Sequence, residues 1–260
     1  MNDLIEIRQD EELAVIFLNR PEAYNAFNLE MITQLAKQLT RLAKEDSVKG
    51  IILAGRGKAF CAGGDLKWIV HFSARAGAAF YTLASQFHQA ILEIRRMKKP
   101  VVAAIHGVAA GGGISLALAC DYRIMEKSAI LRQAYTSNGL CIDGGGTFTL
   151  PRIVGLARAM EIAAIDEPIS SEIADRLGLV TRVVEEGKAV EEAIDLMKKI
   201  AKSSLHSFGW AKKLLTDSFN HSLESQLELE REGLSDCADH PDGREGLQAF
   251  MEKRKPKFHD

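Results

Sequence analysis

Hydrophobic residues follow two patterns along the chain. Short, largely β-branched apolar runs are typical of strands buried on both faces, and they cover residues 13–19, 50–54, 101–105 and 179–184. Longer segments repeat apolar residues at helical spacing, most clearly residues 28–44, where Asn28 is the expected N-cap, and residues 80–97. Strands separated by helix-length segments predict crossover connections and an α/β fold.

The last quarter of the chain has a different pattern. From about residue 187 onward we expect no strand, and helical periods cover residues 189–200, 206–219 and 223–233. The apolar residues of these segments include Trp210, Leu214, Leu215, Leu227 and Leu234. A lone helical tail cannot cover this many, so we expect the region to pack against another subunit.

Residues 101–120 carry no formal charge and have Gly111, Gly112 and Gly113 at their centre. The stretch is long enough to span a membrane, but each glycine costs about 1 kcal/mol relative to alanine inside a helix. A buried strand, a tight turn and a buried helix are therefore predicted. Backbone at such a turn can approach a ligand closely, and N–H groups at a helix start point at negative charge, which predicts an oxyanion site.

Gly63 and Gly64 predict a second turn of this kind, between the strand at residues 50–54 and a helix that starts near Asp65. Taken alone, the segment could be an ordinary strand-to-helix turn with Asp65 as the N-cap. Two glycine turns that each follow a buried strand favour a second backbone donor site.

Composition narrows the class of partner. The chain has 260 residues, of which 47% are hydrophobic and 26% charged, as is typical of a globular protein. Its net charge of −2 gives no attraction to nucleic acid or to a membrane. Four cysteines without zinc-site spacing predict reduced thiols and no metal. The acidic N-terminus lacks a signal-peptide pattern, which predicts a cytoplasmic location.

Four motifs carry a family resemblance. KAFCAGGDLKW at residues 58–68 and KPVVAAIHGVAAGGGISLALACDYRI at residues 99–124 resemble two fingerprints of the crotonase (enoyl-CoA hydratase/isomerase) superfamily, and residues 18–31 and 143–156 resemble two further motifs in the same order. The resemblance implies a crotonase-like spiral of ββα turns that binds an acyl-CoA thioester, expected to span residues 1–195. It also implies a C-terminal helical region, residues 196–260, that forms homotrimers or dimers of trimers.

The resemblance also implies roles for individual residues. It places the backbone N–H groups of Gly64 and Gly112 where the family holds the thioester oxygen. The residues mapped to the coenzyme A end are Arg20, Ala23, Ala62, Asp65 and Lys67. A lysine on a helix surface is more often simply solvated, so the assignment of Lys67 has this simpler alternative. No cofactor is implied, because coenzyme A is part of the substrate.

The residues at the reacting atoms depart from the hydratases. The two catalytic glutamates of that group map to Ser115 and Tyr135, which are poor bases at neutral pH because the unperturbed pKa of tyrosine is about 10. We expect both side chains to shape the acyl pocket or to donate hydrogen bonds. The ordinary hydratase mechanism is therefore not favoured.

Asp143 supplies the remaining carboxylate. Its position resembles that of the catalytic aspartate in the ring-epoxyphenylacetyl-CoA and Δ3,Δ2-enoyl-CoA isomerase branch, and one carboxylate suffices for a 1,3-proton shift. We expect its apolar neighbours at residues 140–142 to desolvate it. The alternative is that Asp143 caps a helix at residues 145–150.

An enoyl-CoA isomerase is the activity that these observations favour. One alternative is a hydratase or dehydratase of an unusual enoyl-CoA, cyclic ones included, with Asp143 acting on water. Another is a catalytically weak binding protein on a crotonase scaffold. In aryl-CoA dehalogenases of the superfamily the matching aspartate is a nucleophile, but their helper histidine maps to Ala79 and their tryptophan to Tyr135, which disfavours that reaction.

Overall fold

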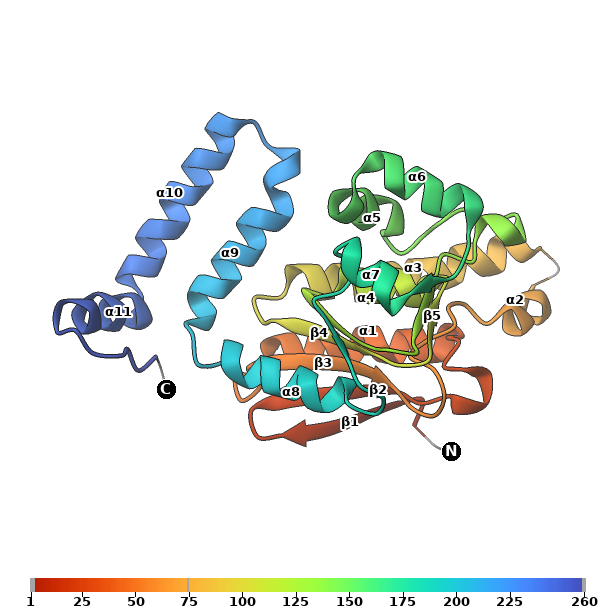
Figure 1. Cartoon of the computed structure of the whole chain (residues 1–260), viewed down its shortest axis with the longest axis horizontal. Helices are drawn as coiled ribbons and strands as arrows, with labels where there is room; N and C mark the ends of the chain where they lie inside the picture. Colours follow the sequence, from red (N-terminus) through yellow and green to blue (C-terminus); the bar gives the residue numbers. More distant parts are fainter. Residues whose placement is uncertain (1–2, 74, 259–260) are drawn as a thin grey trace.

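A six-stranded sheet organises the structure, a computed structural model that describes residues 3–73 and 75–258 (Figure 1). In spatial order the sheet contains β1 (Ile5–Asp10), β2 (Leu13–Leu18), β3 (Gly50–Gly55), β4 (Val101–Ile105), β6 (Tyr122–Glu126) and β9 (Arg182–Val184). β1 and β2 form an antiparallel hairpin, and the other neighbours are parallel. A smaller sheet contains β5 (Val108–Ala110), β7 (Ile130–Arg132) and β8 (Ile169–Ser170).

Helices connect the parallel strands and cover the sheet. The helices that precede β9 in the chain are α1 (Leu29–Lys44), α2 (Leu66–Phe72), α3 (Ala76–Arg96), α4 (Gly112–Ala119), α5 (Gly146–Val154), α6 (Leu156–Ile165) and α7 (Ser171–Arg176). Those after it are α8 (Ala189–Ile200), α9 (Leu205–Asp217), α10 (Leu223–Asp239) and α11 (Pro241–Met251). Short 3-10 turns lie at η1 (Pro21–Ala23), η2 (Thr136–Asn138) and η3 (Ser218–Asn220). The alternation confirms the predicted α/β class.

Both faces of the large sheet are buried, which explains its continuous apolar runs. Ile16 and Ile51 belong to the hydrophobic cluster that includes α1 and α3, whereas Val15 and Ile52 belong to a second cluster with α8. Adjacent residues of a strand point to opposite faces, so a strand covered on both sides needs apolar residues at every position.

The structure confirms some of the predicted strands and shows others that were not predicted. The structure matches the predicted strands at residues 13–19, 50–54 and 101–105 to within one residue, while β9 occupies only the end of residues 179–184. β1, β6 and the strands of two or three residues, β5, β7 and β8, were not predicted, because pairing rather than apolar content defines them. Asn28 caps α1 as predicted and accepts a hydrogen bond from the Met31 amide at 2.9 Å.

The uncharged stretch at residues 101–120 divides as predicted into buried strand, turn and buried helix. β4 lies in the sheet, β5 precedes the turn, and every residue of α4 is buried. Gly111 has a φ of 55°, in the left-handed region that glycine adopts without strain. None of the described helices has the length and apolar character needed to cross a bilayer.

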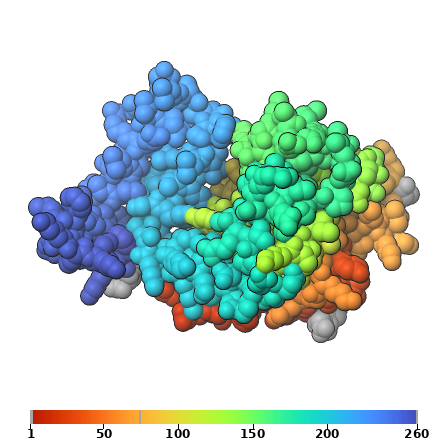
Figure 2. Space-filling model, in the orientation of Figure 1, coloured from red at the N-terminus to blue at the C-terminus, as the bar shows by residue number. Residues whose placement is uncertain are grey.

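The C-terminal helices α9, α10 and α11 lie to one side of the sheet, where they form a distinct lobe (Figures 1 and 2). The helical region predicted from the sequence is therefore present. Its large exposed apolar residues include Leu215, Phe219, Leu227, Leu234 and Phe250. The predicted domain boundary at residue 195 falls inside α8, which packs against the sheet, and the division into two domains remains a prediction.

Candidate active site

Two glycine turns meet beside the small sheet. The Cys61 amide donates to the Val108 carbonyl at 3.1 Å, and the Ala110 amide donates to the Cys61 carbonyl at 2.9 Å. A Cβ atom on Gly63 would lie 2.9 Å from the Gly112 nitrogen. Residue 63 must therefore be glycine, because its φ is 93° and a side chain there would have no room.

The amides of Gly64 and Gly112 are available as donors. Neither N–H has a hydrogen-bond partner within residues 3–73 and 75–258. The Gly112 amide is free because Gly112 is the first residue of α4, where an intrahelical acceptor is lacking. Both glycines line one cavity of about 440 Å³. The two amides can thus serve an oxyanion in this cavity, as the sequence predicts.

The remaining walls of this cavity, called here the acyl pocket, are mostly apolar. α3 contributes Phe80, Leu83 and Phe87, and Tyr81 at the rim is 82% exposed. Among the described residues that line the pocket, Asp143 carries the one carboxylate. An apolar chamber with two free amides and one carboxylate can stabilise a developing negative charge and can also move a proton.

Asp143 faces two other polar side chains. The Tyr135 hydroxyl donates to Asp143 Oδ1 at 2.5 Å, and His88 Nε2 lies 4.0 Å from Oδ2. The predicted desolvation is wrong, because the Asp143 side chain is 36% exposed and Cys141 beside it is also exposed. Burial and the neighbouring carboxylate of Asp143 raise the pKa of Tyr135 far above its usual value, so the phenol stays protonated and acts as a donor.

The alternative role of Asp143 as a helix cap is also wrong. α5 begins at Gly146, and its N-cap, Gly145, is left-handed with no side-chain cap. The main-chain oxygen of Asp143 accepts instead from the Gly146 amide at 3.0 Å and from the Ser115 hydroxyl at 2.8 Å. Ser115 is fully buried and is not part of the pocket lining. Its hydroxyl therefore holds the backbone of the loop, whereas the Asp143 carboxylate is contacted by the Tyr135 hydroxyl.

Four of the five residues mapped to the coenzyme A end, all except Ala62, are joined in one chain of hydrogen bonds. The Ala23 amide donates to the Arg20 carbonyl at 2.9 Å. Ala62 lines the acyl pocket, whereas Lys67 is exposed on α2 and Ala23 is half-buried at the end of η1. Arg20 donates to Asp65 Oδ2 at 3.0 Å, and Asp65 also caps α2 through the amides of residues 67 and 68. Although burial alone would raise the pKa of Asp65, these hydrogen bonds and the Arg20 charge lower it.

Sequence reasoning missed His88. The helper histidine of the aryl-CoA dehalogenases was mapped to Ala79, which is fully buried in the core. In the structure it is His88 that lies beside the carboxylate of Asp143. Helical spacing contained the signal, because His88 is four residues after Ala84, a residue of the pocket wall. The distance to Asp143 could not be inferred, since the two residues belong to segments that meet only in the fold.

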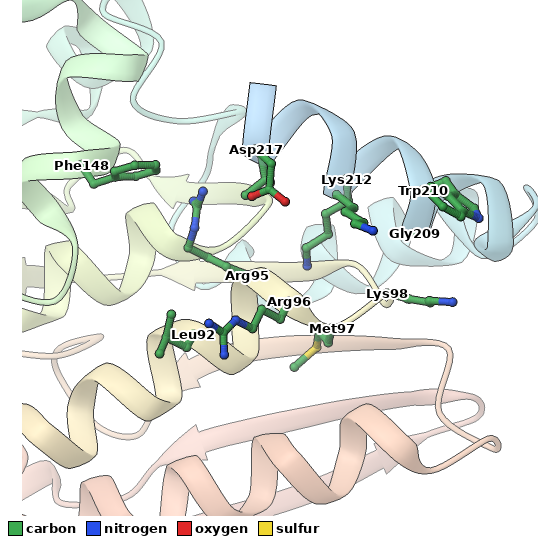
Figure 3. Close-up of a pocket in the computed structure, with 12 residues that line it drawn as sticks. Leu92, Arg95, Arg96, Met97, Lys98, Phe148, Gly209, Trp210, Lys212 and Asp217 are labelled. Atoms are coloured by element: carbon green, nitrogen blue, oxygen red, sulfur yellow. The ribbon is translucent and has the colours of Figure 1, made fainter. Parts of the chain in front are cut away.

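A second cavity of about 420 Å³ has a different chemical character (Figure 3). It lies between the end of α3 and α9, and its charged lining residues are Arg95, Arg96, Lys98, Lys212, Lys213 and Asp217. We call it the basic cavity. Among the described residues, no cluster of three or more histidine, cysteine or acidic side chains is placed to hold a metal ion.

Comparison with known proteins gives a consistent result. The family described as Enoyl-CoA hydratase/isomerase matches residues 8–260. A 1,2-epoxyphenylacetyl-CoA isomerase from Escherichia coli K12 is 34% identical and a crotonyl-CoA hydratase from Syntrophomonas wolfei is 33% identical, each over 259 residues. These alignments cover 99% of both chains for the first relative, and 98% of this chain and 97% of that protein for the second. The solved enoyl-CoA hydratase from Bacillus anthracis superimposes with a TM-score of 0.92 at 33% identity, covering 98% of each chain.

Proposed function

The chain belongs to the enoyl-CoA hydratase/isomerase family of acyl-CoA enzymes, and we propose that within this family it is an isomerase that shifts the double bond of an enoyl-CoA thioester. One observation carries the proposal: in the described part of the chain a single carboxylate, that of Asp143, lines an apolar pocket that also contains the unpartnered amides of Gly64 and Gly112. The positions of the two hydratase glutamates hold Ser115 and Tyr135. A 1,3-proton shift needs one base, and that is the number of carboxylates that the pocket supplies.

In this mechanism Asp143 removes a proton from C2 of a 3-enoyl thioester. Negative charge then moves to the thioester oxygen, where the N–H groups of Gly64 and Gly112 stabilise it. Each such donor lowers the barrier by about 2.7–4 kcal/mol. The protonated Asp143 returns the proton at C4 of the dienolate, so no water enters the product and no cofactor beyond the coenzyme A of the substrate takes part.

Tyr135 assists the carboxylate in this proposal. Its hydroxyl donates to Asp143 Oδ1, which leaves Oδ2 as the oxygen that exchanges the proton with substrate. The hydrogen bond is charge-assisted while Asp143 is ionised, and such bonds are stronger than neutral ones. The phenol therefore orients the base without competing with it for the proton.

A second proposed feature is assembly through the C-terminal helices into a homotrimer or a dimer of trimers. The exposed apolar residues of α9, α10 and α11 support it, because a monomer rarely leaves so much apolar surface in contact with water. Sedimentation at several concentrations would test it, and a monomer at all of them would contradict it. A cytoplasmic location remains a prediction.

The decisive experiment for the reaction uses 2-enoyl-, 3-enoyl- and cyclic dienoyl-CoA thioesters in heavy water. An isomerase moves the double bond without adding water. It leaves deuterium at C2 or C4 in those turnovers in which the proton held by Asp143 exchanges with heavy water before it is returned. Mass spectrometry and NMR of the product therefore separate double-bond migration from hydration. Binding of every thioester without turnover would favour the catalytically weak binding protein.

Hydration remains a second candidate because of His88. Adding water across a double bond needs a base for the water and an acid for the α-carbon, and His88 beside Asp143 Oδ2 provides a second proton-carrying group. A product heavier by one water, formed by the wild type and lost in His88→Gln, would favour this reaction. Retention of isomerisation in His88→Gln would support the single-carboxylate mechanism.

A further inference from the structure

The loop that carries Tyr135 is held by one buried carboxylate, that of Asp166. Asp166 follows α6 and its side chain is 1% exposed. Oδ1 accepts from the Ala134 amide at 2.6 Å, and Oδ2 accepts from the Ser137 amide at 3.1 Å and the Ser137 hydroxyl at 2.6 Å. These donors lie on both sides of Tyr135 in the chain. Asp166 thus holds the backbone on both sides of the phenol, and the Thr136 hydroxyl adds a hydrogen bond to the Ala163 carbonyl at 2.6 Å.

The loop does not adopt this shape by local preference. Ala134 has a φ of 54° and Asp166 itself has a φ of 54°, a left-handed conformation that residues with a Cβ atom rarely adopt. Such conformations persist where the surrounding contacts hold them. Ala134 is held through its own amide, which donates to Asp166, and through its carbonyl, which accepts from the Asn138 side-chain amide at 2.9 Å. The Arg132 side chain adds a further contact by donating to the Asp166 carbonyl at 3.0 Å.

The negative charge of Asp166 strengthens its hydrogen bonds to the loop. Burial by itself would raise the pKa of Asp166, but the hydrogen bonds from Ser137 and Ala134 and the Arg132 charge lower it below its usual value. The carboxylate is therefore ionised at neutral pH, and its hydrogen bonds are of the stronger, charge-assisted kind. A neutral amide at this position could accept from Ala134, but it would present its NH₂ group to the donors of Ser137.

We propose that Asp166 is a positioning residue for proton transfer: it fixes the loop so that the Tyr135 hydroxyl holds Oδ1 of Asp143 and leaves Oδ2 to the substrate. The inference rests on the proposed function, since it needs Asp143 as the base. Asp166 is not part of the lining of the acyl pocket. Asp166 can therefore act on the reaction only through loop residues that do line the pocket, among them Ala134, which it contacts directly, and Tyr135, which carries the hydroxyl.

A double-mutant cycle separates this role from a merely structural one. The variants are Tyr135→Phe, Asp166→Asn and the double variant, and the readout is the rate at which the α-proton of the thioester exchanges in heavy water. We expect each single variant to lower the exchange rate about 10- to 100-fold, with little change in KM. We expect the double variant to be as fast as Tyr135→Phe alone, because the positioned hydroxyl is already absent.

Two further variants serve as a milder test and as a control for the double-mutant cycle. Ser137→Ala removes one of the three hydrogen bonds at an exposed residue, so it should fold, and it should slow exchange several-fold only while Tyr135 is present. This variant replaces Asp166→Asn in the cycle if the latter does not fold. Asp175→Asn, a matched change of an exposed carboxylate near Asp166 in sequence, should exchange at the wild-type rate.

The outcomes are distinct. An Asp166→Asn loss that persists in the Tyr135→Phe background would overturn the positioning role, as would wild-type exchange in Asp166→Asn. Wild-type exchange in Asp143→Asn would instead overturn the proposed function itself, whatever the cycle shows. Restored exchange in Asp166→Glu but not in Asp166→Asn would support the need for a charge at this point.

Discussion

The acyl pocket and the basic cavity are nearly equal in size, about 440 and 420 Å³, yet their chemistry differs. The acyl pocket has apolar walls, two free amides and one carboxylate that faces it. The basic cavity has five cationic side chains and the carboxylate of Asp217 (Figure 3). Volume alone therefore does not identify the catalytic centre; the groups that can stabilise a developing charge and move a proton do.

The basic cavity lies at a joint between the core and the C-terminal helices. Lys212 of α9 is 4% exposed and donates to the carbonyls of Ile94 and Lys99 and to Asp121 Oδ2. These acceptors belong to the segment that ends α3 and precedes β4, and to the start of β6. The side chain thus ties α9 to the sheet, so this region has a structural role, whereas the acyl pocket is where we propose that the reaction takes place.

The largest expected difference between the two cavities is in turnover. Asp143→Asn should lower kcat by about 10²–10⁴-fold, because it removes the general base and keeps its size. Asp217→Asn, the same change in the basic cavity, should leave kcat unchanged. Steady-state kinetics with a 3-enoyl thioester test both, and a fast Asp143→Asn enzyme or a slow Asp217→Asn enzyme would break the assignment.

The free energy of unfolding should depend on a residue of the basic cavity, Lys212. Lys212→Met leaves the Asp121 carboxylate without its cation in a largely buried place, which should lower the free energy of unfolding by about 3–5 kcal/mol. Lys213→Met is the matched control, because Lys213 is exposed and its Nζ lies over the Trp210 ring, 5.0 Å from the ring centre. This substitution should cost about 0.5–1 kcal/mol. Urea unfolding measures both. Equal losses would show that Lys212 does not anchor α9.

The two donor glycines should respond unequally to alanine. A Cβ atom on Gly112 would lie 2.5 Å from the Phe27 ring, whereas a Cβ on Gly64 would have ordinary contacts of 3.5 Å with Leu83 and 3.7 Å with Ile69. Gly112→Ala should therefore cost about 1–3 kcal/mol of stability and distort the pocket, while Gly64→Ala should be tolerated. Thermal melts and kcat of the pair test this, and equal behaviour would contradict the packing argument.

The smallest expected effect is in the pH dependence of stability. The pKa of Asp166 is lower in the folded protein than its usual value of about 3.9. Its contribution to stability is therefore fully present above that usual value and is lost as the pH falls through the folded pKa. The stability difference between wild type and Asp166→Asn should hence shrink in acid and stay constant near neutral pH. A stability difference that grows as the pH falls would contradict the lowered pKa of Asp166.

Local patterns along the chain allowed most of the fold to be predicted. Apolar runs located β2, β3 and β4, and helical periods located α1 and α8. Two glycine runs located the turns whose glycines line the pocket. Strands of two or three residues, such as β5, β7 and β8, escaped prediction because their identity depends on a partner strand. The roles of the site residues remain predictions for the experiments above.

The sequence by itself determined the α/β class, the two glycine turns and the absence of glutamate at residues 115 and 135, since each is encoded in neighbouring residues. Only the tertiary structure decided that Asp143 faces the pocket and does not cap α5, and that His88 and Tyr135 are its neighbours. It also showed that Asp166 holds the Tyr135 loop. Periodicity describes one segment at a time, whereas these contacts join segments whose separation is set by how the helices and strands pack.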